Sequence, residues 1–249
     1  MKILAVYSSK GGVGKTATSV NLAYTALQTG QRVLLCDMDS QGAASYYYRI
    51  KPKKKFNRSR LLSGSYYQFV RGTDFPGLDL LPAHFSFRNL DIALKKGQNE
   101  KNRKILYGLL KPLETEYDII ILDCPPNLTL LSENIITAAD CVITPVVPTT
   151  LSVLALNQLL KLFKKVDCEK RKILAFFSMV ERRKTMHRGV MDKYGKYPIF
   201  MKNYIPYSAE IEKMGLYRKP VGASGNSRSI GSNAYKNLWS EIQERRLSG

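Results

Sequence analysis

A segment near the N-terminus has the residue types that hold a nucleotide phosphate. Residues 9–17 read SKGGVGKTA and directly follow a short apolar run. Glycines in such a segment let the backbone curl until successive N–H groups point at phosphate oxygens, and the positive end of the next helix faces the same anion. Lys15 would reach the β- and γ-phosphates, and the Thr16 hydroxyl would bind Mg²⁺. The rest of the expected cradle is Gly11, Gly12, Val13, Gly14 and Ala17.

The segment departs from the strict phosphate-loop pattern G-x-x-x-x-G-K-[ST] at one position. Ser9 stands where the first glycine is required, and a second lysine, Lys10, follows it. The alternative is a glycine-rich turn that happens to end in Lys-Thr. We favour the phosphate loop because a strand precedes the segment, a helix follows it, and two acidic motifs come later in order.

Three aspartates form a second group of candidate functional residues. Asp37 and Asp39 lie in LLCDMDSQG, and Asp123 ends the apolar run in YDIIILD. Ligands of an open α/β sheet lie beyond the carboxyl ends of its strands, so we expect these carboxylates beside the phosphate loop. Mg²⁺ takes oxygen ligands and usually keeps several waters, which suits outer-shell binding by Asp37 and Asp123. Each of these two could instead cap the turn after its strand, but the loop favours the metal interpretation.

The elements that must position these residues alternate along the chain. Strands are predicted at Ile3–Tyr7, Arg32–Cys36, Leu78–Leu81, Asp118–Leu122, Cys141–Val147, Lys172–Ser178 and near Asn203–Ile205, and helices at Thr16–Thr29, Leu151–Val166 and Ala234–Arg246. The run at 119–122 is apolar on both faces, as in a central parallel strand covered on each side. This alternation predicts an α/β fold, a doubly wound and mostly parallel sheet with helices on both faces, in a single domain over residues 1–249.

The net charge of the chain indicates which kind of partner it binds. The chain has 39 Lys and Arg against 20 Asp and Glu, a formal net charge of +19. Residues Arg49–Arg60 contain seven of the basic residues and no acid. Such a balance favours a polyanion, either nucleic acid or an anionic membrane surface, over a protein that is basic only for solubility. For Lys53–Lys55, a DNA contact and a solvated flexible loop are equal alternatives.

Other features exclude several classes of protein. The four cysteines have no CxxC spacing, which argues against a zinc site or a disulfide framework. No signal peptide is evident, and no apolar stretch approaches the roughly 18 residues of a membrane-spanning helix. We therefore expect a cytoplasmic protein with reduced thiols. His187 is expected to be solvated, and Trp239 is expected to pack the final helix onto the core.

Further motifs follow in a characteristic order. KGGVGKT, LLCDMDSQG, YDIIILDCPP and ITPVVPTTLSVLAL precede FFSMVERR, NYIPYSAEIEK and KPVGASGNSRS. In this combination the chain resembles the ParA branch of the deviant Walker-A (ParA/MinD) ATPases over almost its entire length. The resemblance implies a P-loop NTPase that dimerises with ATP, binds double-stranded DNA nonspecifically and partitions or positions a cargo. It also implies ATP and Mg²⁺ as cofactors, slow hydrolysis stimulated by a small adaptor or ParB-like protein, and a nucleoid-associated location.

The resemblance assigns roles to matching residues. Lys10 resembles the signature lysine that crosses a dimer interface to the partner's nucleotide, and Asp39 matches the acid that positions the attacking water. Asp37 and Asp123 match the pair that holds Mg²⁺-bound waters, and the segment from Asp123 to Asn127 corresponds to a switch that senses the γ-phosphate. Two residues fall where family members usually contact adenine, namely Met179 and Pro206.

The family's usual DNA-binding residues are only partly present. Tyr207 and Ile230 stand at two positions that are commonly basic in members that bind DNA. We therefore expect compensating charge from Arg182, Arg183, Arg218, Lys219 and Arg228, and from the Lys51–Arg60 segment. Because the sequence begins at the first strand, no N-terminal helix-turn-helix is expected.

Two other functions remain as alternatives. A MinD-like membrane switch would need a basic amphipathic helix at the C-terminus, whereas the tail NLWSEIQERRLSG resembles a helix packed on the body, so no membrane partner is expected. The second alternative is a small-molecule P-loop enzyme or an iron–sulfur reductase of related fold. Cys124 adjoins the switch, but no convincing second cluster ligand follows it.

Overall fold

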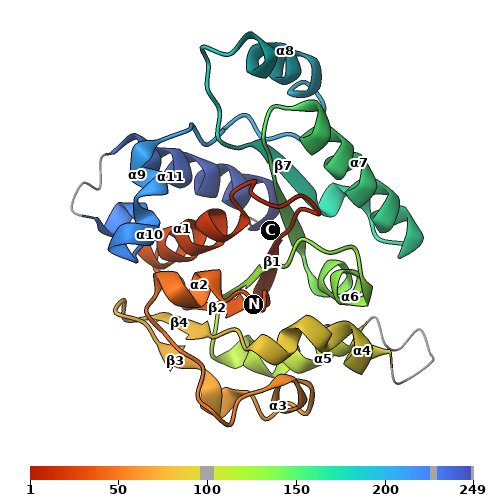
Figure 1. Cartoon of the computed structure of the whole chain (residues 1–249), viewed down its shortest axis with the longest axis vertical. Coiled ribbons are helices and arrows are strands. Elements are labelled where there is room, and N and C mark those ends of the chain that lie inside the picture. Colours follow the sequence, from red (N-terminus) through yellow and green to blue (C-terminus); the bar gives the residue numbers. More distant parts are fainter. Residues whose placement is uncertain (96–103, 225–228, 248–249) are drawn as a thin grey trace.

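The chain folds around a seven-stranded sheet with helices on both faces (Figure 1). The computed structural model describes residues 1–95, 104–224 and 229–247. Across the sheet the strand order is β3-β4-β2-β5-β1-β6-β7, and within these residues only the β3–β4 pair is antiparallel. The strands are β1 (Lys2–Val6), β2 (Val33–Asp37), β3 (Arg71–Gly72), β4 (Leu78–Leu81), β5 (Ile119–Asp123), β6 (Cys141–Val146) and β7 (Ile173–Phe177). The predicted doubly wound, mostly parallel sheet is confirmed.

Helices cover the sheet on two sides. The helices are α1 (Lys15–Gln28), α2 (Ala43–Tyr47), α3 (Arg58–Leu62), α4 (Leu90–Leu94), α5 (Ile105–Leu110), α6 (Leu130–Ala138), α7 (Thr150–Lys165), α8 (Thr185–Tyr194), α9 (Ala209–Glu212), α10 (Met214–Tyr217) and α11 (Ile230–Ile242). In Figure 1, α1 and α11 lie to the left of the strands, and α6 and α7 lie to the right. In the described residues no helix is both long and apolar enough to cross a bilayer.

The central strand β5 separates two apolar cores. All five of its residues are buried. Ile120 and Leu122 pack into the core that also contains Leu156 of α7, whereas Ile119 and Ile121 pack into the core that contains Trp239 of α11. Apolar side chains on both faces of one strand therefore require helices on both faces of the sheet, as the sequence pattern predicted. The burial of Trp239 confirms its predicted packing role.

The strand predicted near Asn203–Ile205 is wrong. This segment meets β7 and the loop after it through isolated bridges, Ala175 with Phe200 and Val180 with Pro206. Between the bridges, the backbone amides of Lys202 and Asn203 donate to the carboxylate of Glu241, at 2.9 Å each. A side chain of α11 thus takes the hydrogen bonds that a continuous strand would give to its neighbour.

The predicted solvation of His187 is also wrong. Its side chain is only 4% exposed in α8, and Nδ1 accepts a hydrogen bond from the backbone N–H of Glu181 at 3.1 Å. Burial, with the nearby charge of Lys184, lowers the pKa of the imidazole. His187 therefore closes the turn that begins α8 rather than facing solvent.

Candidate functional site

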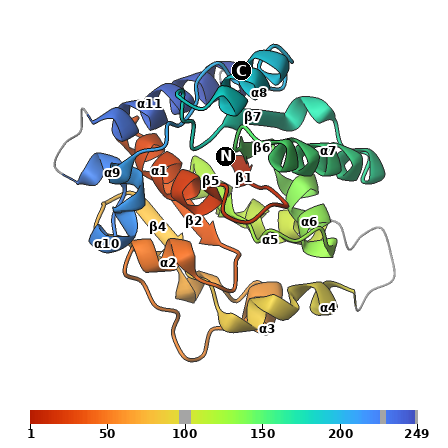
Figure 2. The ribbon, with the colours of Figure 1, turned by 45° about the horizontal axis from the view of Figure 1, so that its top comes forward.

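The predicted phosphate loop connects β1 to α1. Figure 2 shows it in dark red. Gly12 has φ +70° and Gly14 has φ +91°, both in the left-handed region that favours glycine. A Cβ atom on Gly14 would lie 3.2 Å from Oγ of Ser178, so this position has little room for a side chain. Gly14 also caps α1, so the first amides of the helix open beside the loop.

The two lysines of the loop are directed to different places. Nζ of Lys15 donates to the backbone carbonyl of Lys10 at 3.1 Å, and the Lys15 side chain is almost buried. Burial lowers the pKa of this ammonium, whereas the charges of Asp123 and Asp39 oppose that shift. Nζ of Lys10 donates instead to Oγ of Ser152 in the first turn of α7, at 3.2 Å.

Asp37 and Asp123 end adjacent parallel strands and are register partners. One oxygen of Asp37 accepts from both the backbone N–H and the hydroxyl of Ser45, at 2.7 Å each. One oxygen of Asp123 accepts from the hydroxyl of Ser19 at 2.8 Å. The second oxygen of each carboxylate is buried and has no partner among the described residues.

Burial raises the pKa of both carboxyl groups, and the charge of Asp123 raises that of Asp37 further. Hydrogen bonds from Ser19 and Thr16 and the charge of Lys15 act in the opposite direction on Asp123. A bound divalent cation with its waters would satisfy both buried oxygens and favour their ionised form. The donor set therefore fits Mg²⁺.

Asp39 lies in the turn after β2. Its Oδ1 accepts from the backbone N–H of Gln41 at 3.0 Å, and Gly42, with φ +67°, follows in the left-handed conformation. The charge of Asp39 acts on the pKa values of both Lys15 and Asp123. The structure thus brings Asp39 to the same edge of the sheet as the loop.

Met179 and Pro206 also lie near the loop. Met179 has φ +54°, and its Cε lies 3.7 Å from the place of a Cβ on Gly14. Pro206 is bridged to Val180, the next residue along the chain from Met179. The two predicted adenine contacts are therefore neighbours across this bridge, next to the start of α1.

Sequence reasoning missed the partners that hold these groups. Ser19 and Ser45 orient the two aspartates, and Ser152 receives Lys10. The position of Ser19, one helical turn after Lys15, is the signal that could have identified it. Ser45 and Ser152 have no comparable signal because their partners are distant in sequence or on another element.

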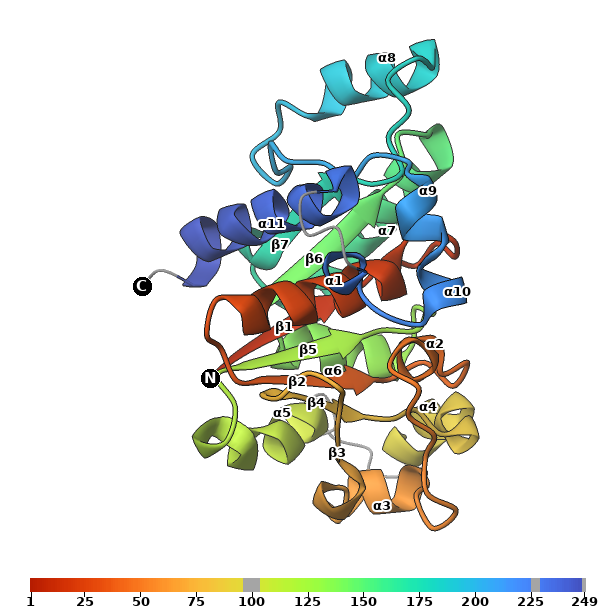
Figure 3. The same ribbon diagram turned by 90° about the vertical axis from the view of Figure 1, so that its left-hand side faces the viewer.

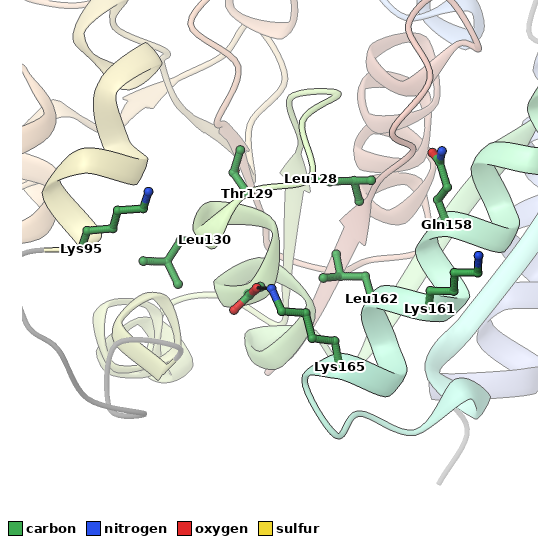
Figure 4. Close-up of a pocket in the computed structure, with 9 residues that line it drawn as sticks. Lys95, Leu128, Thr129, Leu130, Gln158, Lys161, Leu162 and Lys165 are labelled. Atoms are coloured by element: carbon green, nitrogen blue, oxygen red, sulfur yellow. Dashed lines mark hydrogen bonds and ion pairs between the residues drawn. The ribbon is translucent and has the colours of Figure 1, made fainter.

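A groove of about 670 Å³ adjoins the loop without containing it (Figure 4). It lies between α6 and α7, beside the residues that follow Asp123, and its lining residues are Lys95, Leu128, Thr129, Leu130, Glu133, Gln158, Lys161, Leu162 and Lys165. An ion pair of 2.8 Å joins Lys165 to Glu133. Oε1 of Gln158 accepts from the hydroxyl of Ser9 at 3.4 Å, which connects the groove wall to the phosphate loop.

The predicted DNA-binding residues do not form one cluster. Arg182 and Arg183 precede α8, at the top of Figure 1, whereas Arg218 and Lys219 follow α10 at its left. The guanidinium of Arg218 lies 4.3 Å from the ring centroid of Tyr46, and its Nε donates to the Tyr46 carbonyl at 3.0 Å. Arg228 lies outside the described residues.

Comparison with known proteins gives a consistent assignment. A family profile described as "AAA domain" (AAA_31) matches residues 1–176. The chain is 30% identical over 250 residues to "Sporulation initiation inhibitor protein Soj" of Bacillus subtilis (strain 168), covering 97% of this chain and 98% of that protein. It is 30% identical over 257 residues to "Chromosome partitioning protein ParA" of Caulobacter vibrioides (strain NA1000 / CB15N), covering 98% and 95%.

A solved structure agrees with the fold. Cobyrinic acid a,c-diamide synthase from Mycobacterium smegmatis, with bound ADP and magnesium, superposes with a TM-score of 0.80 at 26% identity. The match covers 98% of this chain and 94% of that one. The extent of the sequence matches, together with the loop and the carboxylates described above, shows that the chain belongs to the ParA family of P-loop ATPases.

Proposed function

We propose that this protein is a switch ATPase that dimerises with ATP, binds DNA without sequence preference and partitions or positions a cargo. The observation that carries the proposal is the different direction of two lysines in one loop. Lys15 turns inward onto the loop, and the Lys10 ammonium lies on Ser152 of α7. An ammonium directed away from its own loop would act on the nucleotide of a second copy, where it would neutralise charge that develops on the transferred phosphoryl group.

ATP and Mg²⁺ are the proposed cofactors. The backbone of the loop and Lys15 would hold the phosphates, and the Thr16 hydroxyl would bind the metal. The buried oxygens of Asp37 and Asp123 that lack a partner among the described residues would accept hydrogen bonds from metal-bound waters, and the cation would supply charge neutralisation at the phosphates. Met179 and Pro206 would contact the adenine.

Hydrolysis is proposed to be slow and stimulated by a small adaptor or ParB-like protein. Asp39, on the edge of the sheet, would position the attacking water. Because Lys10 would act on the partner's nucleotide, the catalytic set of one chain is complete only in a dimer. Turnover conditional on assembly is the property of a switch rather than of a metabolic enzyme.

The proposed DNA partner is supported by the net charge of +19. Lysine and arginine contacts to phosphates release counterions and give sequence-independent, salt-sensitive binding. Such binding would place the ATP-bound dimer on the nucleoid.

The test is size measurement of the parent and Lys10→Ala with Mg²⁺ and a non-hydrolysable ATP analogue. We expect the parent to form a dimer that depends on the analogue and the variant to remain largely monomeric, with reduced ATPase activity. Ser152→Ala is the matched control, because it removes the contact of Lys10 but keeps the ammonium, and it should still dimerise. An unchanged dimer fraction and unchanged turnover in Lys10→Ala would refute the assigned role.

A small-molecule P-loop enzyme is the second candidate. It is favoured by the 26% identity to the cobyrinic acid a,c-diamide synthase over nearly the whole chain. This candidate predicts ATP turnover that needs a small-molecule acceptor and is indifferent to duplex DNA and to Lys10. The size and DNA measurements therefore separate the two candidates.

A further inference from the structure

We propose that the segment between α2 and α3 is the surface that binds the phosphates of duplex DNA, an inference that rests on the DNA binding proposed above. We call this surface the basic platform and define it as Lys51, Lys53, Lys54, Lys55, Arg58 and Arg60. Five of the six side chains are exposed, and Arg58 is half-buried. Among the described residues, none of the six makes an ion pair or a side-chain hydrogen bond, whereas neighbouring Arg49 is paired with Asp74. The platform therefore offers unneutralised charge to an external anion.

The backbone that carries this charge is anchored, not loose. Phe56 is fully buried and stacks on Phe69, with ring centroids 4.8 Å apart, and meets Phe87 edge-on at 5.6 Å. The Asn57 side chain caps α3 by accepting from the amides of residues 59 and 60 at 3.0 and 3.1 Å. The backbone N–H of Arg58 donates to Oγ of Ser86 at 2.8 Å. Charges held on an ordered frame lose less conformational entropy on binding, so these contacts favour a DNA contact over a flexible solvated loop.

Cation–aromatic pairs flank the platform at both ends. Arg88 lies 4.0 Å from the ring centroid of Phe85, in the same turn that bonds to Arg58. At the other end, Arg218 lies over Tyr46, just before the basic segment begins. These pairs hold two further guanidinium groups beside the platform, and the second joins a residue of the C-terminal part to the same surface.

The platform is separated from Arg182 and Arg183. In Figure 1, α3 lies at the bottom and α8, next to Arg182 and Arg183, lies at the top. In Figure 3 the strands run from left to right, and α2 with the loop leading to α3 lies at their right-hand ends. The platform thus lies toward the edge of the sheet that carries the phosphate loop.

The test compares variants of the whole chain, loaded with Mg²⁺ and a non-hydrolysable ATP analogue, on random-sequence duplex DNA over a salt series. One variant is the triple change Lys53→Gln, Lys54→Gln, Lys55→Gln. The matched control removes the same total charge from exposed lysines on and after α7, by Lys161→Gln, Lys164→Gln, Lys170→Gln. Each phosphate contact contributes close to one unit to the slope of log K against log salt, so the platform variant should lose about two to three units and bind at least about ten-fold more weakly at low salt. The control should lose less than about one unit.

The outcomes separate this inference from the proposed function. If the parent binds DNA and both triple variants lose the same affinity, binding depends only on total charge. The assignment of DNA binding to the platform is then wrong, but the proposed DNA-binding function is supported. If the parent does not bind DNA with the analogue present, both the proposed DNA-binding function and the platform as its surface are refuted. Vesicles containing anionic lipid form a second arm: loss of vesicle binding in the platform variant, with DNA binding unchanged, would assign the surface to a membrane instead. Unchanged thermal stability and basal ATPase activity exclude misfolding, because the substituted lysines are exposed and lie outside the nucleotide site.

Discussion

The hydroxyl of Tyr7, the residue directly after β1, donates a hydrogen bond to the backbone carbonyl of Asn127 at 2.8 Å. Tyr7 is fully buried, and burial raises the pKa of its phenol, so it remains a donor at all physiological pH values. The same carbonyl accepts from Oγ of Ser132 at 2.9 Å. The segment from Asp123 to Asn127, which we propose as a switch that senses the γ-phosphate, is therefore hydrogen-bonded to the residue that joins β1 to the phosphate loop.

Tyr7→Phe removes this tie and keeps the ring. Loss of one buried hydrogen bond should lower the free energy of unfolding by about 1 kcal/mol, and the melting temperature by about 2–4 °C. Because the lost bond ends at Asn127, amide hydrogen exchange should accelerate in residues 124–129, measured by mass spectrometry without nucleotide.

Tyr66→Phe is a matched control for this prediction. The Tyr66 ring is buried, and its hydroxyl donates to the carbonyl of Leu109 on α5, away from the switch. This variant should cost comparable stability and leave exchange in the switch unchanged. Equal acceleration in both variants would mean that Tyr7 only stabilises the fold.

The sequence predicted the sheet and its functional edge because both follow from local patterns. Alternation of apolar strands with helices identified the fold, and the place of Asp37 and Asp123 at strand ends brought them together once the strands were parallel. The sequence did not predict that residues 203–205 form no strand. The amide of Asn203 bonds to the carboxylate of Glu241, which lies 38 positions away in the sequence. The burial of His187 and the contact of Arg218 with Tyr46 likewise depend on packing between elements, which has no periodic signal.

Asp39→Ala should trap an ATP-bound dimer. The change removes the carboxylate proposed to position water but leaves Lys15, Thr16 and Asp123 to hold nucleotide and metal. We expect turnover to fall by about a hundred-fold or more, as for loss of a group that assists proton transfer or orients the nucleophile. Single-turnover hydrolysis and size measurement with ATP itself would check this, and turnover at the parent rate would show that another group performs the step.

Glu241→Gln should reduce stability at neutral pH and flatten the acid limb of the stability profile. Burial alone would raise the pKa of Glu241, but hydrogen bonds from the amides of Asn203 and Lys202 and from the Asn203 side chain, with the charge of Arg245, outweigh it and lower the pKa. A depressed carboxyl pKa gives stability that is present above the usual value of 4.5 and lost as pH falls through the folded value.

The measurement for Glu241→Gln is urea unfolding from neutral to acid pH. The variant should be less stable than the parent by about 1–3 kcal/mol at neutral pH, and the difference should shrink below the usual carboxyl range. Glu169→Gln is the control, because in the described part of the chain the Glu169 side chain makes only an exposed ion pair with Arg171, so this variant should show no such convergence. A pH-independent difference would show that the change disturbs packing rather than charge.

Asp37→Asn should stabilise the protein without nucleotide while weakening its response to Mg²⁺-ATP. The parent buries a carboxyl group whose pKa is raised by burial and by Asp123, and one of its oxygens has no partner among the described residues. A raised carboxyl pKa makes stability greatest at acid pH and reduces it as pH rises through the folded value, because ionisation then occurs inside the protein. An amide has the same shape without this charge, and its oxygen can still accept from Ser45.

In thermal unfolding, the stability advantage of Asp37→Asn over the parent should therefore widen from acid to mildly alkaline pH. Addition of Mg²⁺-ATP should raise the melting temperature of the parent more than that of the variant, because the parent offers two carboxylates to metal-bound water, Asp37 and Asp123, and the variant offers Asp123 alone. Ser45→Ala, which removes one of the donors to this carboxylate, should shift stability in the opposite direction without nucleotide. A variant Asp37→Asn that is less stable than the parent at alkaline pH, or equally stabilised by Mg²⁺-ATP, would contradict the assignment of Asp37 to the metal.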